Sequence, residues 1–176
     1  MGFPHTTEGA VAMAMAANSI NVEAGRSTVH EQMRLYNSYL FAGDREPEAP
    51  EKIKQQAVEV DEFMAQQAGV KMGELLPAGV YMRNNVIGYK IISESKDAVA
   101  LWLLTRVIQR VSEKQEESSF TGALLGLRWQ DGDWKLSAAA TVQAQKETEA
   151  ETEPSLVAPG DPAFDEAGWT AIRTAS

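Results

Sequence analysis

The sequence has 176 residues, a length typical of one domain, and its 44% hydrophobic and 23% charged residues are ordinary for a globular protein. It contains no cysteine, which excludes a disulfide framework, a thiol nucleophile and any cysteine-ligated metal site. Its net charge of −9 argues against nucleic-acid binding, because phosphate recognition depends on basic surface.

Membrane and export signals are missing from the sequence as given. No apolar run approaches the ~20 residues that cross a bilayer, and the start, Met1 to Thr6, lacks the basic and apolar regions of a signal peptide. We therefore expect this chain to be soluble by itself. A membrane anchor upstream of Met1 is compatible with this expectation, since the chain begins almost directly on a predicted helix.

The first predicted helix begins at Thr6 or Thr7, either of which can cap it, and is followed by a natural stop at Gly25. Residues 9–17 are mostly small, which predicts close packing against the sheet or another helix. The residues expected on its inner stripe are Val11, Met15, Asn18 and Val22.

Two further helices are expected before residue 70. The second opens with a capping-box pattern from Thr28 to Glu31 and ends at Gly43-Asp44. The third follows the Pro- and Glu-rich entry 46–51 and ends before Gly69. Its predicted apolar face consists of Ile53, Ala57, Val60, Met64 and Ala68.

Beyond the helices, the hydrophobic period changes to that of strands. Short strands are expected at 80–83 and 87–93, followed by a long run at 98–111. This run is apolar on both faces at its beginning and rich in Val, Ile, Thr and Trp, which favours a central strand. A helix is the alternative for the same run, because Leu and Ala also suit helices.

The strongest local signal is a β-hairpin that turns on Asp131-Gly132. Alternating segments at 120–129 and 134–143 flank the Asp-Gly pair, as is typical of a two-residue hairpin. We expect Leu125, Leu127 and Trp129 to share one face. The residues expected on one face of the returning strand are Trp134, Leu136, Ala138, Ala140 and Val142.

The fold class predicted from this order is α+β, with N-terminal helices packed on a curved, cone-like antiparallel sheet. We expect the helices-plus-sheet domain to occupy residues 1–143 and an acidic, Pro-containing flexible segment to occupy residues 144–162. Residues 163–176 form a C-terminal segment that either docks through Phe164, Trp169 and Ile172 or remains a frayed tail.

Neither a metal site nor a cofactor site is predicted. The two histidines, His5 and His30, fall at helix starts, where surface or capping roles are usual, and a zinc site needs three or four convergent ligands. Arg106 and Arg110 are expected on the outward face of the long strand, although they could also line an anion pocket.

One catalytic arrangement is compatible with the sequence, although we predict no catalytic residue. Asp61, at the margin of the third helix, could project into the cone as a general base, with Tyr81 and Tyr89 polarising a carbonyl. The alternative is a solvated Asp at a helix edge and two tyrosines that face the core.

Two segments carry a resemblance to known proteins. The hairpin from Leu127 to Leu136, Leu-Arg-Trp-Gln-Asp-Gly-Asp-Trp-Lys-Leu, resembles the closing hairpin of the nuclear transport factor 2-like (cystatin-like) superfamily. The opening run from Gly2 to Ala12, Gly-Phe-Pro-His-Thr-Thr-Glu-Gly-Ala-Val-Ala, is similar to a run in actinobacterial conjugation-associated proteins of the TcpC and VirB-type scaffold kind. In those proteins the domain follows a transmembrane helix.

The resemblance implies a non-enzymatic scaffold domain of a membrane-associated conjugation (type IV secretion-like) machinery, located on the extracytoplasmic face. Its implied partners are proteins, namely copies of itself and other envelope-complex subunits. Nucleic acid is not expected, and membrane contact would come through a segment absent from this chain. The alternative is a small-molecule-binding or isomerase-like enzyme that uses the cone cavity.

Overall fold

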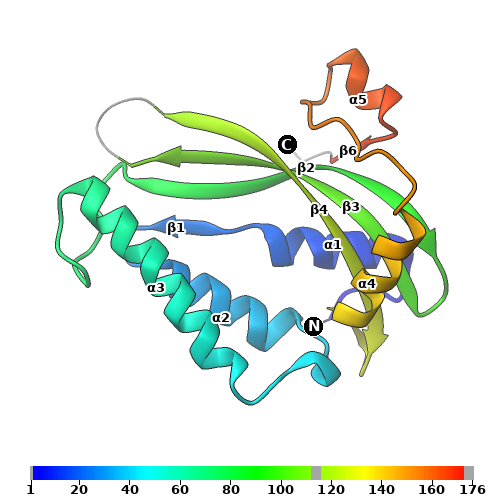
Figure 1. The fold of residues 1–176 in the computed structure, drawn as a ribbon, viewed down its shortest axis with the longest axis horizontal. Coiled ribbons are helices and arrows are strands. Elements are labelled where there is room, and N and C mark those ends of the chain that lie inside the picture. Colours follow the sequence, from blue (N-terminus) through cyan, green and yellow to red (C-terminus); the bar gives the residue numbers. More distant parts are fainter. Residues whose placement is uncertain (1, 112–115, 173–176) are drawn as a thin grey trace.

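The computed structural model describes residues 2–111 and 116–172 and confirms the predicted α+β class. A curled antiparallel sheet forms a half-barrel, and helices pack on it (Figure 1). The helical elements are α1 (Thr7–Asn18), α2 (Thr28–Tyr39), the 3-10 turn η1 (Ala42–Asp44), α3 (Ala49–Ala68), α4 (Ala138–Glu147) and α5 (Pro162–Glu166). The strands are β1 (Asn21–Glu23), β2 (Tyr81–Glu94), β3 (Ala98–Arg110), β4 (Glu117–Gln130), β5 (Asp133–Leu136) and β6 (Thr170–Ala171).

The sheet follows the order β1-β2-β3-β4-β5, and the short β6 pairs with β2. The helix α1 lies beneath its concave face (Figure 1). The small residues predicted to pack closely do so: Ala10, Ala14 and Ala17 are fully buried and bring the helix backbone close to the strands. The concave-face residues of the same core are Val86, Val99, Leu101, Leu103, Leu127 and Trp134.

The predicted length of the first helix is wrong, because α1 ends at Asn18 and not near Gly25. The side chains of Asn18 and Ser19 bond back to carbonyls of the preceding turn, at 2.8 Å each. The chain then enters β1, where Val22 lies opposite Met82 of β2. Val22 is therefore buried as a strand residue and not on a helical stripe.

The start of α2 also differs from the prediction by one residue. Ser27 is the capping residue, its hydroxyl accepts the His30 N–H, and the His30 ring accepts the Ser27 N–H in return. The predicted box from Thr28 to Glu31 does not form. Glu31 is instead buried and paired with Arg34 at 3.1 Å, so its carboxylate is unavailable for capping.

The third helix is confirmed as α3, and Gly69 ends it in the left-handed conformation at φ 71°. Its inward face is rotated from the predicted one. Ala57, Met64 and Ala65 are buried, whereas Val60 is 39% exposed.

The predicted strands at 80–83 and 87–93 are one continuous strand, β2, with irregularities between Val86 and Gly88 and between Ile91 and Ser93. These bulges shift the alternation of side chains. The predicted gap between the two strands is absent, because Asn84 and Asn85 pair with Val107 and Arg106 of β3. The run at 98–110 is a strand, as predicted, and the helical alternative is wrong.

The Asp131-Gly132 hairpin is confirmed, and Trp129 pairs with Trp134 across it. Both turn residues have positive φ, 52° at Asp131 and 82° at Gly132, as in a type I′ turn.

The returning strand is much shorter than predicted, because β5 stops at Leu136 and residues 138–143 belong to α4. Ser137 ends the strand and caps the helix by accepting the Ala140 N–H. The helix crosses β4 so closely that a Cβ at Gly126 would lie 2.1 Å from the Ala140 carbonyl carbon. The row Ala138, Ala140 and Val142 therefore lies on a helix and not on a strand face.

The C-terminal segment packs on the face of the sheet opposite α1. Phe164 and Trp169 are 2% and 5% exposed and surround Leu104 of β3. The Trp169 indole N–H also donates to the Ser155 carbonyl at 2.8 Å. At the other end of the predicted acidic segment, α4 continues to Glu147, so the boundary at 143 falls inside a helix.

Candidate functional site

The carboxylate of Asp61 is a capping group and not a free base. Its Oδ1 accepts the N–H of Thr28 at 2.7 Å and its Oδ2 accepts the N–H of Val29 at 3.3 Å. These are first-turn donors of α2 that have no partner within the helix itself, so α3 supplies a cap to its neighbour. This interaction fixes the two helices relative to each other.

The two tyrosines lie far from each other. Tyr81 and Tyr89 are eight positions apart on β2, which corresponds to about 25 Å along a strand. The Tyr81 hydroxyl donates to Glu116, and this hydrogen bond raises the pKa of Tyr81. Tyr89 packs against the core around α1. Asp61, Tyr81 and Tyr89 are therefore not brought together in one site, and α1 covers the concave face that the cone cavity would need.

A pocket of about 300 Å³ lies between the start of α2, the C-terminal half of α3 and the loop after it. We call it the helix–loop pocket. Its apolar lining comes from Val29, Met64, Ala65, Met72, Leu75 and Leu76. The Nδ1 atom of His30 accepts the Ser27 N–H, so in the neutral ring the proton is on Nε2. Since Asp61 is engaged in capping, the pocket offers apolar walls, the His30 ring and the charged side chains of Arg26 and Glu74.

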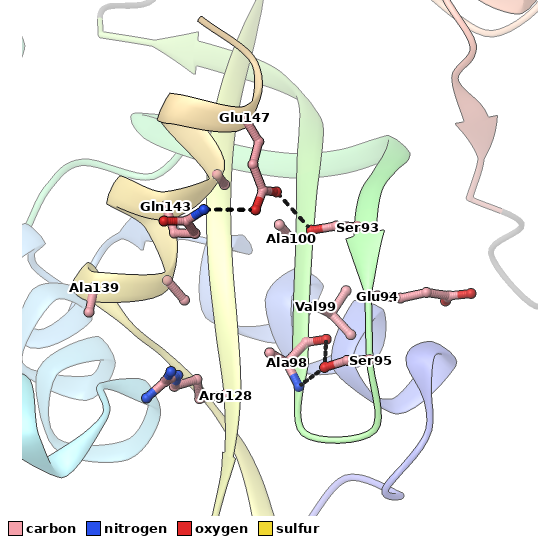
Figure 2. A pocket seen from close by; sticks show the side chains of 12 residues that line it. Ser93, Glu94, Ser95, Ala98, Val99, Ala100, Arg128, Ala139, Gln143 and Glu147 are labelled. Atoms are coloured by element: carbon pink, nitrogen blue, oxygen red, sulfur yellow. Dashed lines mark hydrogen bonds between the residues drawn. The ribbon is translucent and has the colours of Figure 1, made fainter.

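A groove of about 390 Å³ lies between α4 and the hairpin that joins β2 to β3 (Figure 2). Its lining includes Ala98 and Ala100 from β3 and Ala140 and Ala144 from α4. These short side chains leave the space open.

The two ends of this groove differ in chemistry. Glu147 accepts hydrogen bonds from Ser93 at 3.1 Å and Gln143 at 3.0 Å (Figure 2). Arg128 is exposed at the groove, and no described acidic side chain lies within ion-pair distance of it. The groove therefore offers a cationic group beside an alanine-lined surface.

Four exposed apolar side chains fall between residues 60 and 75 in the sequence. Val60 and Phe63, three positions apart on α3, are 39% and 56% exposed, and Met72 and Leu75 on the following loop are 50% and 71% exposed. We call these four residues the α3-loop surface. Met72 and Leu75 also border the helix–loop pocket.

The sequence analysis missed the groove because it extended the last strand through 143. The signal that could have found α4 was Ser137, a capping residue, followed by Ala-Ala-Ala-Thr-Val-Gln-Ala-Gln-Lys-Glu, which is rich in good helix formers.

The outward position that the sequence predicted for Arg106 of the long strand is confirmed. Arg106 is exposed on the outer face, where its Nε donates to Ser118 at 3.1 Å.

The N-terminal run and the hairpin that carry the family resemblance are in direct contact. The Phe3 N–H donates to Asp133 Oδ1 and the Trp134 indole N–H donates to the Pro4 carbonyl, both at 2.8 Å. The two segments therefore form one structural unit, although they are 130 residues apart.

Comparisons with known proteins gave no match: no family model, no curated protein and no solved structure is significantly similar to this chain. Among the described residues, no helix has the length and apolar character needed to cross a bilayer.

Proposed function

We propose that this chain is a non-enzymatic assembly domain of a membrane-associated, conjugation-type machinery, held at the extracytoplasmic face of the membrane in the full-length protein. The observation that carries the proposal is the α3-loop surface, where Phe63, Met72 and Leu75 are each at least half exposed. Contiguous exposed apolar surface is typical of sites that bind other proteins, and Met72 and Leu75 border the same pocket.

The conjugation setting rests on the resemblance of the N-terminal run and of the closing hairpin to scaffold proteins. These two segments pack against each other, so the resemblance concerns one continuous structural unit and not two separate pieces of the chain.

Site-specific photo-crosslinking in the native host cell tests this proposal. A photoreactive residue at Phe63 or Leu75 of the full-length protein should give adducts with envelope-complex subunits. The same residue at the exposed, polar Gln66 of α3 is the control and should give far fewer. Adducts with no envelope protein, together with a strictly monomeric mass for the protein extracted from membranes, would remove the proposal.

A second candidate function is the binding of a small apolar molecule in the helix–loop pocket. The pocket volume of about 300 Å³ and its apolar lining favour it. Because the chain has only two histidines, the imidazole signals of His30 and His5 can be followed separately by NMR. A ligand in this pocket should shift the His30 signals and leave those of His5 unchanged. Equal shifts of both, or none across a panel of apolar compounds, would reject this candidate.

A further inference from the structure

The strand β4 has a long edge that no described segment pairs with. One side of β4 is bonded to β3 along residues 117–128, whereas β5 covers the other side only from Leu127 to Gln130. In Figure 1 the first half of β4 forms the outermost strand at the top of the sheet. We call residues 118–124 the free edge.

The direction of the backbone groups on the free edge follows from Gly126. Its N–H donates to Thr141 Oγ1 and its carbonyl accepts the Ser137 N–H, both at 2.9 Å, so the groups of Gly126 point away from β3. The backbone N–H and carbonyl groups of every second residue point to the same edge of a strand, and the register between β3 and β4 is unbroken. The residues that share this outward direction are Ser118, Phe120, Gly122 and Leu124.

The outward N–H and carbonyl groups of these residues have no hydrogen-bond partner among the described residues. Leu156 of the C-terminal segment lies over the face of Gly122, but the free edge itself carries none of the protective features that natural edge strands contain. Its sequence, Ser-Ser-Phe-Thr-Gly-Ala-Leu, contains no charge and no proline, and the register shows no bulge. Natural edge strands are normally blocked by one of these features, so an unblocked edge of this length is suited to accept another strand.

We propose that the free edge pairs antiparallel with the free edge of a second copy of this chain, so that the two sheets become continuous. The inference rests on the proposed assembly function and names one partner for it. Two copies use their whole free edges only when residue 118 of one lies opposite residue 124 of the other and the strands run in opposite directions. The two-fold axis then passes through Thr121.

This register also suits the side chains. Phe120 of each copy lies opposite Gly122 of the other, beside the Leu156 methyl that already covers Gly122 within its own chain. No charged residues meet within the ladder, which matters because each copy carries a net charge of −9. In this pairing the backbone of Ser118 in one copy forms hydrogen bonds with that of Leu124 in the other, and Phe120 does the same with Gly122. The two-fold axis repeats both pairs and completes the ladder.

A single cysteine tests the register, because the chain contains no other. In the proposed pairing the two Thr121 residues form a non-hydrogen-bonded pair with Cα atoms about 4.5 Å apart, within the range of a disulfide. The matched control is Ser119→Cys, which is also exposed on the same face. The two Ser119 residues would be displaced by four positions along the strand, about 13 Å, too far for a disulfide.

Under mild oxidation of the full-length protein, Thr121→Cys should form a covalent dimer at least tenfold faster than Ser119→Cys. A mixture of Ser119→Cys and Ala123→Cys should form the mixed dimer. Equal and slow oxidation of all these variants, or preferential capture of a different protein by Thr121→Cys, would overturn the pairing with a second copy.

Sedimentation of Cys-free variants gives an independent readout. Thr121→Glu places like charges directly opposite each other at the two-fold axis and should shift the protein from dimer to monomer. Ser119→Glu, which lies opposite Ala123, should remain dimeric. If both variants sediment as the unaltered protein does, the edge pairing is wrong, whereas adducts at Phe63 with envelope subunits would still support the assembly function.

Discussion

The imidazole of His5 stacks on the indole of Trp129, with ring centroids 3.9 Å apart and planes inclined by 8°. The Nε2 atom of His5 also lies 2.9 Å from Asp97 Oδ1, and Trp134 meets the His5 ring edge-on. His5 therefore joins the N-terminal run, the β2–β3 turn and the closing hairpin at one end of the sheet.

Replacing His5 should weaken this junction. His5→Ala loses the stacked ring, and we expect the free energy of unfolding to fall by about 1 kcal/mol, the size typical of an aromatic pair. Urea denaturation followed by tryptophan fluorescence measures the change.

The control for this prediction is His5→Phe, which keeps an aromatic ring and loses the contact with Asp97. Because exposed ion pairs contribute little, this variant should retain most of the stability. Unchanged denaturation midpoints for His5→Ala would show that the stack does not hold the N-terminal run in place.

The approach of α4 to β4 gives a second prediction. A Cβ at Gly126 would meet the Ala140 backbone at about 2 Å, and backbone atoms cannot move aside as a flexible side chain can. Gly126→Ala should therefore cost about 2 kcal/mol or more, as overpacking does elsewhere. Thermal unfolding measures this loss, and Gly25→Ala is the control because its nearest neighbour is a Leu75 methyl at 3.9 Å. A Gly126→Ala protein as stable as the control would show that α4 does not dock as described.

The closing hairpin could be predicted from sequence because its signal is local. The Asp131-Gly132 pair requires two positive φ angles, and few residue pairs adopt them easily. The extent of the last strand could not be predicted in the same way. Ala138 to Ala140 suit a helix or a strand, and the choice is made by Gly126, which lies on another strand and lets a helix approach.

The candidate site was harder to predict than the fold for a similar reason. Asp61 was correctly placed at the margin of its helix, but its partners are the N–H groups of Thr28 and Val29, more than 30 positions away. Nothing in the spacing along α3 reveals such a contact. Residues 120–124 of the free edge were predicted as a strand, whereas β4 begins earlier, at Glu117. Which side of the strand remains unpaired depends on where β5 stops.

The capping role of Asp61 gives a third prediction. Asp61→Ala leaves the Thr28 N–H without its partner at 2.7 Å and should lower the free energy of unfolding by about 1–2 kcal/mol, as loss of a helix cap does. Chemical denaturation followed by circular dichroism measures it. Glu62→Ala, one position along and exposed, removes the same charge and should change stability by less than about 0.5 kcal/mol. Equal effects of the two substitutions would indicate a general charge effect and would contradict the capping role.

The carboxylate of Asp133 gives the last prediction, which concerns acid stability. Burial by itself raises the pKa of Asp133, but the hydrogen bond from the Phe3 N–H, the Lys135 ammonium and the Trp134 N–H together outweigh it. The pKa of Asp133 in the folded protein is therefore lower than its usual value of about 3.9. A carboxylate of this kind stabilises the fold above its unfolded pKa, and the stabilisation is lost as the pH falls through its folded pKa.

Asp133→Asn should consequently be less stable than the unaltered protein by about 1–2 kcal/mol at pH 7. This difference should begin to shrink as the pH falls below about 4 and should disappear below the pKa of Asp133 in the folded protein. Denaturation curves recorded between neutral and acid pH give the stability difference at pH 7 and the pH range over which it is lost. Asp131→Asn is the matched control, because it removes the same charge from the neighbouring turn position, and asparagine tolerates the positive φ found there. A stability difference for Asp133→Asn that stays constant down to the most acidic pH would mean that the ionised carboxylate is not what holds Phe3 and Lys135 to the hairpin.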